Sequence, residues 1–439
     1  MKRLLIALFL VLGMSLSSGE FLQAQNVRVL DIYEAVSIAK ENNLSIKLSK
    51  LNVQQAEYKV SEVYSENLVP NLTLTSRYTR AFKKPKFIIF GESFEVGTDN
   101  SLTTALQFQE SLPILGTPVF SGIRIAEYYT NLQGEFLNQS EIEVKRNVKQ
   151  AFYSVMLAKQ VLVLNNEILA NALENFSVVE ARYRNGVTTE FDYLRAKVRV
   201  ENVRPNVSQS EKNLVLAKNN LSNIMGIPSE QQIDVAGALV YDSTEVYGTT
   251  QTLINTISER NVLVRQLQIS KKINEELVNV NEANYLPKLS VFGNYNLEAN
   301  ENDDKSISEY KFNNSIAAGL SLSWDLNLFR NSYKVQQAEV EIKKNEIQIN
   351  DLKRNLRLQT ENVIVRLEDA RNRIRSQYAT VGEAARGLEL ANISYRNGVI
   401  TQIDVLDANL IYSQSNLAYL SAIYDYLVAR ADLEALLEK

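Results

Sequence analysis

The chain of 439 residues contains neither cysteine nor histidine. This absence excludes disulfide bonds, thiolate nucleophiles and histidine acid–base catalysis, and it removes the usual protein ligands of zinc and copper. Carboxylates alone can support hydrolysis, but no pair of Asp or Glu residues stands out at a catalytic spacing. The sequence therefore predicts no cofactor, no metal site and no enzymatic activity.

Glycine (16 residues) and proline (7 residues) are scarce, so long uninterrupted helices or strands are expected. The formal net charge is only −4, and the Lys and Arg residues are dispersed along the chain, which argues against nucleic acid as a partner. Beyond the N-terminus, no segment approaches 18 consecutive apolar residues, so no transmembrane helix is predicted.

The N-terminus has the pattern of a secretory signal peptide. Met1-Lys2-Arg3 is followed by an apolar run from Leu4 to Leu12 and by a plausible cleavage site after Ala24. An N-terminal anchor helix is the alternative, but the apolar run is short for a membrane span. We therefore predict that residues 1–24 form a signal peptide and that the protein is exported.

A twelve-residue segment occurs twice. Tyr183–Leu194 reads YRNGVTTEFDYL, and 212 positions later Tyr395–Leu406 reads YRNGVITQIDVL. A repeat over half the chain predicts two similar halves related by a pseudo-twofold axis. We expect a first repeat at 25–230, a linker or equatorial segment at 231–250 and a second repeat at 251–439.

Each half has the same predicted order: a helix, a strand pair, a long helix, a tip and a return helix. The tips, at 185–188 and 397–400, are centred on Asn-Gly, which favours a sharp turn. The periodicity predicts helices at 30–69, 121–184, 188–225, 252–286, 331–396 and 400–438. Pro205 is expected to kink the first return helix.

The strand pairs, at 71–112 and 288–327, show alternation of apolar and polar residues. This alternation has two interpretations. In the first, one face packs on a soluble core and the other meets water. In the second, one face meets lipid and the other lines a wet lumen. Strands of about ten residues suit a tilted membrane crossing. Four strands are too few to close a membrane barrel, so a membranous sheet requires several chains, and three chains give twelve strands.

The second long helix carries two heptad series. One series begins at Val335 and continues to Ala370, and the other runs from Leu367 to Tyr395. Heptads indicate coiled-coil packing, and two series on one helix indicate neighbours on two sides. The expected fold is mainly α with four strands per chain, in which long antiparallel helical hairpins form the wall of an α-barrel.

The strand entries are duplicated as well: Val69-Pro70-Asn71-Leu72 in the first half corresponds to Leu286-Pro287-Lys288-Leu289 in the second. Together with the order of helices and the Asn-Gly-Val tips, they resemble the bacterial outer membrane efflux protein family of TolC-like channel-tunnels. The resemblance covers essentially the whole chain after residue 24. It implies a homotrimer with a 12-stranded transmembrane β-barrel in the outer-membrane lipid and a helical barrel in the periplasm. It also implies a passive exit duct of a tripartite efflux or type I secretion system. The partners would be a periplasmic adaptor (membrane fusion protein) and an inner-membrane pump of RND, ABC or MFS type.

The tips have two interpretations. Asn-Gly turns end helices because both residues tolerate a positive φ, which is a structural role. In the family that the chain resembles, a glycine-centred tip docks against adaptor hairpins. By that resemblance the docking residues are Gly186, Val187, Thr188, Gly398, Val399 and Ile400.

Asp404 and Asp407 follow the second tip at i and i+3, on one face of a helix. A solvated surface is one interpretation, and a capping role for Asp404 looks weak because that residue lies beyond the expected first residues of the helix. The resemblance implies instead that these carboxylates line a periplasmic gate. Threefold symmetry would then form rings that favour cations. Asp192 is the counterpart of Asp404 in the first half.

The chain departs from the family pattern at one position. Some members carry an Arg two residues after the second-tip glycine, whereas this chain has Ile400. The closed entrance is therefore expected to rely on other contacts, for which Arg184 and Arg396 near the tips are candidates. Two other function classes compete with the duct: a non-pore periplasmic coiled-coil scaffold or adaptor, and an exported carboxylate enzyme. The sequence does not identify the transported substrate.

Overall fold

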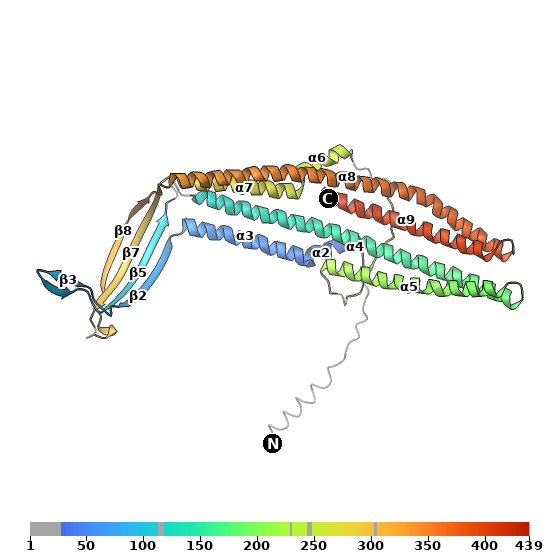
Figure 1. Cartoon of the computed structure of the whole chain (residues 1–439), viewed down its shortest axis with the longest axis horizontal. Helices are drawn as coiled ribbons and strands as arrows, with labels where there is room; N and C mark the ends of the chain where they lie inside the picture. The colour runs from blue at the N-terminus through green and yellow to red at the C-terminus, as the bar shows by residue number, and fades with distance from the viewer. Residues whose placement is uncertain (1–27, 113–117, 229–230, 244–247, 303–304, 439) are drawn as a thin grey trace, which may run out of the picture. The chain divides into compact units, whose positions relative to one another are not determined.

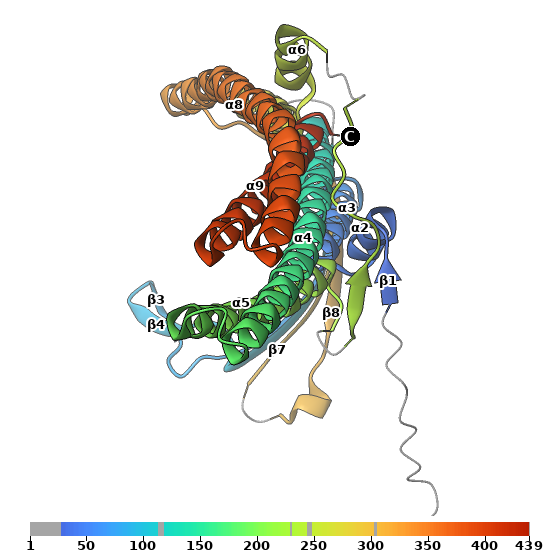
Figure 2. The ribbon, with the colours of Figure 1, turned by 90° about the vertical axis from the view of Figure 1, so that its right-hand side faces the viewer.

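The computed structural model describes residues 28–112, 118–228, 231–243, 248–302 and 305–438 (Figures 1 and 2). The predicted signal peptide lies outside the described residues. The chain divides into two compact units, and each unit takes segments from both sequence halves. We call them the sheet unit (Ser45–Ile142, Tyr247–Asn362 and Leu436–Lys439) and the tip unit (the chain up to Leu44, Glu143–Val246 and Val363–Ala435).

The sheet unit contains a four-stranded antiparallel sheet in the order β2-β5-β7-β8. Its strands are β2 (Asn71–Arg80), β5 (Asn100–Ser111), β7 (Lys288–Glu301) and β8 (Asn313–Ser323). The two predicted strand pairs are confirmed, and the first pair joins the second through β5 and β7. Trp324 and Leu326, which the alternation assigned to the last strand, lie beyond the end of β8.

The register sorts the side chains by polarity. Cross-strand partners share a face, and one face is apolar across all four strands: Leu74 pairs with Leu106, Leu106 with Tyr295, and Tyr295 with Ile316. The other face is polar, as in the row Thr73, Gln107, Asn294 and Ala317. The sheet therefore has the two-faced pattern predicted from the alternation.

Four helical segments of the sheet unit lead into or out of this sheet: α3 (Leu44–Leu68), α7 (Val262–Ala283) and the N-terminal parts of α4 (Val119–Arg184) and α8 (Leu328–Arg396). Arg124 on α4 forms an ion pair with Glu276 on α7 at 2.7 Å. Asn274 on α7 donates a hydrogen bond to Asn345 on α8 at 2.6 Å. The helices run from the end of the sheet where β2 begins.

Two predicted helices are interrupted. The segment expected as one helix over 30–69 consists of β1 (Arg28–Leu30), α2 (Ile32–Asn42) and α3, and the break lies at Asn43. The segment expected as one helix over 252–286 consists of α6 (Thr250–Arg260) and α7, and the break lies at Asn261. Asn261 ends α6 and also caps α7, because its side chain accepts a hydrogen bond from the Leu263 amide at 3.1 Å.

The segment between β2 and β5 contains a small β-hairpin that the sequence analysis missed. Its strands are β3 (Lys86–Ile89) and β4 (Glu92–Glu95), and they pair with each other and not with the main sheet. In Figure 1 this hairpin projects from the end of the sheet at which β2 finishes. The second loop, between β7 and β8, contains the short helix η1 (Ile307–Glu309).

The tip unit is built from the C-terminal parts of α4 and α8, from the return helices α5 (Glu190–Met225) and α9 (Gln402–Leu436), and from α2. Members of both predicted heptad series of α8 are buried in this unit: Val363 and Ala370 belong to one, and Leu367, Ile374 and Tyr395 belong to the other. Two buried series confirm that α8 has neighbours on two sides. Pro205 lies inside α5, which remains a single helix through it.

The tip unit also contains a two-stranded parallel pairing. β1 pairs with β6 (Ile233–Val235), which falls within the predicted linker 231–250. Asp234 on β6 forms ion pairs with Lys159 on α4 at 3.0 Å and with Lys218 on α5 at 3.1 Å. These contacts fasten the segment between the two halves to the first helical hairpin. Along the described chain, no helix combines the length and hydrophobicity needed to cross a membrane.

Candidate functional site

The two helical tips have the same backbone geometry. Gly186 (φ 71°) and Gly398 (φ 75°) occupy the left-handed region directly after α4 and α8. The Gly186 amide donates to the Tyr183 carbonyl at 3.0 Å, and the Val187 amide donates to the Arg182 carbonyl at 2.8 Å. This pair of bonds is a Schellman motif, which satisfies the last carbonyls of the helix. The second tip repeats both bonds from Gly398 and Val399, so the structural role of the glycines is confirmed.

The residues around each glycine are accessible. Val187 and Val399 are exposed, Thr188 and Ile400 are half-buried, and a β-carbon on Gly186 would meet no atom within 4 Å. In Figure 1 the α4–α5 and α8–α9 turns lie at the same end of the tip unit. The six predicted tip residues thus form two compact ends with protruding valines.

Asp404 has a capping role that the sequence analysis judged weak, and that judgement was wrong. Helix α9 begins at Gln402, and the Asp404 carboxylate accepts hydrogen bonds from the Thr401 amide at 2.8 Å and the Thr401 hydroxyl at 2.7 Å. This is the reciprocal half of a capping box, made by Asp. These two hydrogen bonds lower the pKa of Asp404, so the carboxylate stays ionised at neutral pH.

Asp192 is held in a related way in the first half. Its carboxylate accepts hydrogen bonds from the hydroxyls of Thr188 at 3.2 Å and Thr189 at 2.8 Å, and Thr189 is the N-cap of α5. Asp407 lies one turn beyond Asp404 on α9 and is exposed. The structure therefore places the three predicted gate carboxylates within the first two turns of the return helices.

A small apolar core joins the two hairpins beneath the tips. It contains Val179 of α4, Ala196 of α5, Tyr395 of α8 and Val405 of α9, all buried. Ile400 packs against this cluster. At the position where an Arg was expected from the resemblance, the chain thus has a side chain that stabilises the junction by apolar burial.

Two arginines connect the hairpins: Arg182, which the sequence analysis did not name, and Arg396, which it did. Arg182 of α4 donates a hydrogen bond to the Tyr395 carbonyl at 3.1 Å, and its guanidinium lies 5.0 Å from the centre of the Tyr395 ring. Arg396 of α8 forms an ion pair with Glu174 of α4. Arg184, by contrast, pairs with Glu180 on its own helix at 2.8 Å. No spacing in the sequence marks Arg182 or Glu174, because their partners lie more than 200 residues away.

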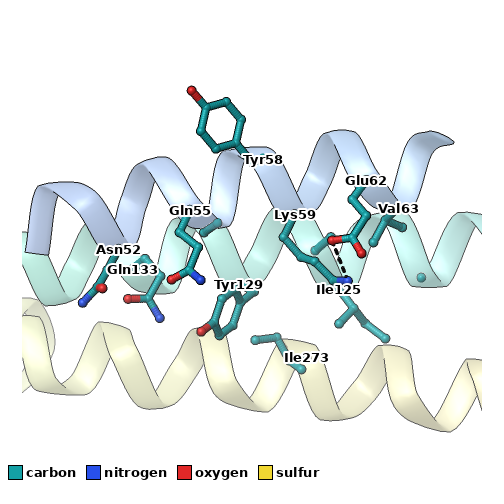
Figure 3. A pocket seen from close by; sticks show the side chains of 13 residues that line it. Asn52, Gln55, Tyr58, Lys59, Glu62, Val63, Ile125, Tyr129, Gln133 and Ile273 are labelled. Carbon is teal, nitrogen blue, oxygen red and sulfur yellow. Dashed lines mark ion pairs between the residues drawn. The ribbon is translucent and has the colours of Figure 1, made fainter. Parts of the chain in front are cut away.

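The sheet unit has a groove of about 940 Å³ between α3, α4 and α7. Figure 3 shows its lining: amides such as Gln55 and Gln133, the ring of Tyr129, and the aliphatic Ile125 and Ile273. Its charged pair, Lys59 and Glu62, is joined by a 2.8 Å ion pair. This lining suits side-chain packing and offers no arrangement for acid–base chemistry. Among the residues described, no three Asp or Glu side chains are grouped so as to hold a metal ion.

Comparison with known proteins agrees with this architecture. The model of the outer membrane efflux protein family matches residues 35–227 and 253–438. The outer membrane protein TolC of Escherichia coli (strain K12) is 20% identical over 449 residues, covering 100% of this chain and 86% of that protein.

Two solved structures share the fold. The outer membrane protein VceC of Vibrio cholerae has a TM-score of 0.74 at 15% identity, with 92% of this chain and 96% of that chain covered. The CmeC outer membrane channel of Campylobacter jejuni has a TM-score of 0.76 at 16% identity, covering 93% and 85%. Because the family model spans both halves, the chain belongs to the outer membrane efflux protein family, and its place is the outer membrane, where it serves as an exit duct for efflux.

Proposed function

We propose that three copies of the chain form one continuous duct that passively conducts substrates from an inner-membrane pump to the cell exterior. The four-stranded sheet is the observation that carries this proposal. One face is apolar across all four strands, its side chains are exposed at Leu74 of β2, Leu106 of β5 and Ile316 of β8, and β2 and β8 are the sheet edges. Open edges are not tolerated in lipid, and pairing β8 of one copy with β2 of the next removes every edge.

The aromatic residues at the two ends of the apolar face support a membrane position. Tyr78 lies near the far end of β2, is 51% exposed, and donates from its hydroxyl to Asn100 at 2.6 Å. Trp324 follows β8 at the helix-proximal end and donates from its indole nitrogen to the Tyr285 carbonyl at 3.0 Å. Aromatic girdles of this kind flank the apolar band of membrane barrels.

The tips are proposed to dock a periplasmic adaptor that joins the duct to a pump of RND, ABC or MFS type. The capped turns around Gly186 and Gly398 support this role because they are compact and present exposed apolar side chains at one end of the tip unit. Asp404, Asp407 and Asp192 are proposed to line the periplasmic entrance. The carboxylate of Asp404 is kept ionised by Thr401, which suits a cation-attracting ring. No catalytic step is assigned to the chain.

The experiment that tests this proposal is the mass of the purified protein in detergent. We expect a homotrimer that resists SDS until it is heated and that leaves the membrane fraction only with detergent. A monodisperse monomer that stays in solution without detergent would sink the proposal. That result would favour the alternative class, a non-pore periplasmic coiled-coil scaffold, which has no use for an exposed apolar sheet.

A further inference from the structure

The β3–β4 hairpin exposes far more apolar surface than a short surface loop requires. Phe87 and Phe94 pair across the two strands and share a face, and both are about half exposed. Ile88 is 77% exposed, and Phe90 is fully exposed at the turn. A concentration of aromatic side chains on a protruding element marks a surface that another surface covers.

The turn of the hairpin adds a second observation. Phe90 and Gly91 connect the paired residues Ile89 and Glu92, and both have a positive φ, 53° for Phe90 and 89° for Gly91. Two-residue turns of this type favour Asn or Gly at the first position. A bulky residue with positive φ is an outlier and costs free energy on the order of 1 kcal/mol or more. The chain thus accepts a cost in stability to place a phenyl ring at the outermost point of the hairpin.

The base of the hairpin fixes the side of the sheet toward which it leans. Ala81 and Asp99 continue the β2–β5 ladder, and the alternation puts both on the polar face. Lys84 reaches back to this face through an ion pair with Asp99 at 2.8 Å and a hydrogen bond to Asn302 at 3.0 Å. The hairpin is therefore tethered on the polar face of the sheet, opposite the apolar face.

The position of the hairpin along the duct follows from the course of β2, and this step rests on the proposed function. β2 begins next to α3 and ends at Arg80, so the hairpin lies at the end of the sheet far from the helices (Figure 1). With the helices in the periplasm, that end is the extracellular mouth, and the polar face is the lumen wall. The hairpin consequently stands over the opening of the duct.

The dimensions and the charge both suit contact with other copies. Three copies of the four-stranded sheet, with strands ~4.8 Å apart and tilted by ~40°, close a barrel of radius about 12 Å. Four residues per hairpin strand span roughly 14 Å, which reaches the axis. Residues 82–99 carry three Lys against two Glu and one Asp, and Lys86 pairs with Glu95 at 3.1 Å. A neutral, internally paired segment can meet its own copies without repulsion, whereas binding to an anionic lipid surface requires net positive charge.

We propose that the β3–β4 hairpins of three copies meet across the extracellular mouth and form an apolar cap with Phe90 at its centre. The cap covers the exposed phenyl rings and narrows the extracellular mouth by excluding water from the space around them. Passing cargo displaces the hairpins, because the described links between hairpin and sheet lie at the hairpin base. The duct then has an outer constriction in addition to the periplasmic entrance.

The absence of cysteine makes a direct test available, since Phe90→Cys introduces the only thiol of the chain. The purified detergent-solubilised variant is oxidised with copper phenanthroline and run on a non-reducing gel. We expect covalent dimers that contain up to two of every three chains, because a threefold contact leaves one thiol over. Ser308→Cys is the matched control: it lies exposed on η1, in the other loop at the same end, and should give little dimer.

Each outcome separates the cap from the duct. Intact trimers in which the thiol of Phe90→Cys stays unoxidised would overturn the cap and leave the proposed function standing, whereas failure to form trimers would count against the proposed function itself. An environment-sensitive dye attached to that thiol provides a second measurement. If the dye reports burial in phosphatidylglycerol-containing vesicles, and no disulfide forms, the hairpin binds lipid and the cap is wrong.

Conductance in planar bilayers provides a third measurement. Phe90→Ser should raise single-channel conductance by about twofold or more relative to Ser308→Ala, because loss of the phenyl ring lets water into the constriction. An unchanged conductance also contradicts the cap.

Discussion

The tip glycines are constrained by backbone conformation and not by space. A β-carbon at Gly398 would approach only the Arg182 guanidinium, at 3.5 Å, and one at Gly186 would meet nothing. The positive φ at both positions is nevertheless unfavourable for any residue with a β-carbon, by roughly 1–2 kcal/mol. A substitution can therefore weaken the tip without any steric clash, and its size decides whether docking is also blocked.

We predict that Gly398→Ala lowers the stability of the tip unit by about 1 kcal/mol, while Gly398→Asn, which tolerates positive φ, costs less. Gly382→Ala is the matched control, because Gly382 lies inside α8 in open space, where Ala is the better helix former. Thermal unfolding measures this effect.

Bulky residues at both Gly186 and Gly398 should abolish export while the trimer still forms. An efflux assay measures this second effect, and normal efflux from the double bulky variant would contradict adaptor docking at the tips.

The carboxylates of Asp404 and Asp407 are expected to have different roles, so their removal should have different effects. The hydrogen bonds from Thr401 lower the folded-state pKa of Asp404. Its contribution to stability is therefore present above the unfolded pKa, near ~3.9, and is lost as the pH falls through the folded value. We predict that the Thr401 amide exchanges several-fold faster with solvent in Asp404→Asn, and that the acid dependence of this exchange disappears in the same variant. Equal exchange rates in the variant and the wild type at pH 7 would refute the capping role.

Asp407 offers the cleaner test of the gate, because Asp404 also caps its helix. Asp407→Asn should reduce cation selectivity in planar bilayers and weaken block by multivalent cations, since a threefold ring loses three charges. Glu389→Gln removes an equal charge from α8, where Glu389 pairs with Arg386 at 2.6 Å, and should change neither property. Unchanged selectivity in Asp407→Asn would mean that this residue does not line the entrance.

At the scale of elements, the junction between the two hairpins combines an apolar core with two arginine contacts. Arg182 binds the Tyr395 carbonyl and ring, and Arg396 pairs with Glu174, so both tie α4 to α8. Ile400 packs against the core, so this position joins the hairpins by apolar contact and without charge. The two helical hairpins can separate here only if both the apolar core and the arginine contacts break.

We predict that Arg182→Met combined with Arg396→Gln raises basal conductance several-fold, because the hairpins lose their polar links. Arg184→Gln is the control, since Arg184 pairs within α4 and this change should leave conductance as it was.

Ile400→Arg tests the position without charge. It is expected to lower basal conductance if this duct opens more readily than relatives that carry an Arg there. Single-channel recordings decide both, and an added Arg without effect on conductance would contradict that expectation.

Features of long period were predicted well from the sequence, and local exceptions were predicted poorly. Heptads over α8 and alternation over β8 were readable because many residues repeat one pattern. The break at Asn43 was not, because an Asn within a helical pattern is no strong stop signal. The β3–β4 hairpin was missed because Phe90 occupies a turn position that normally signals itself by Asn or Gly. Capping by Asp404 was misjudged because it depends on where α9 begins, to within a residue, and helix boundaries are the least certain part of a sequence-based prediction.

At the scale of the whole molecule, the proposed relation of the chain to water and lipid depends on one sheet. A soluble sheet would cover its apolar face with its own helices, yet Ile316 of β8, in the same cross-strand row as Leu106 and Tyr295, is 80% exposed. Its neighbour Ala317 points to the polar face and pairs with Asn294, whereas Ile316 pairs with Tyr295. Adjacent residues on one strand are thus expected to meet lipid and a wet lumen.

We predict that Ile316→Arg prevents insertion or trimer assembly, because an Arg on the lipid face near the bilayer midplane costs roughly 2–4 kcal/mol per chain. Three copies multiply that cost in a closed barrel. Ala317→Arg places the same side chain one residue away on the lumen side, where water solvates it, and should leave the heat-modifiable trimer at wild-type yield. The fraction of SDS-resistant trimer in outer-membrane extracts measures both variants. Equal trimer yields would mean that the apolar face of the sheet does not contact lipid, and the barrel would have to be abandoned in favour of a soluble assembly.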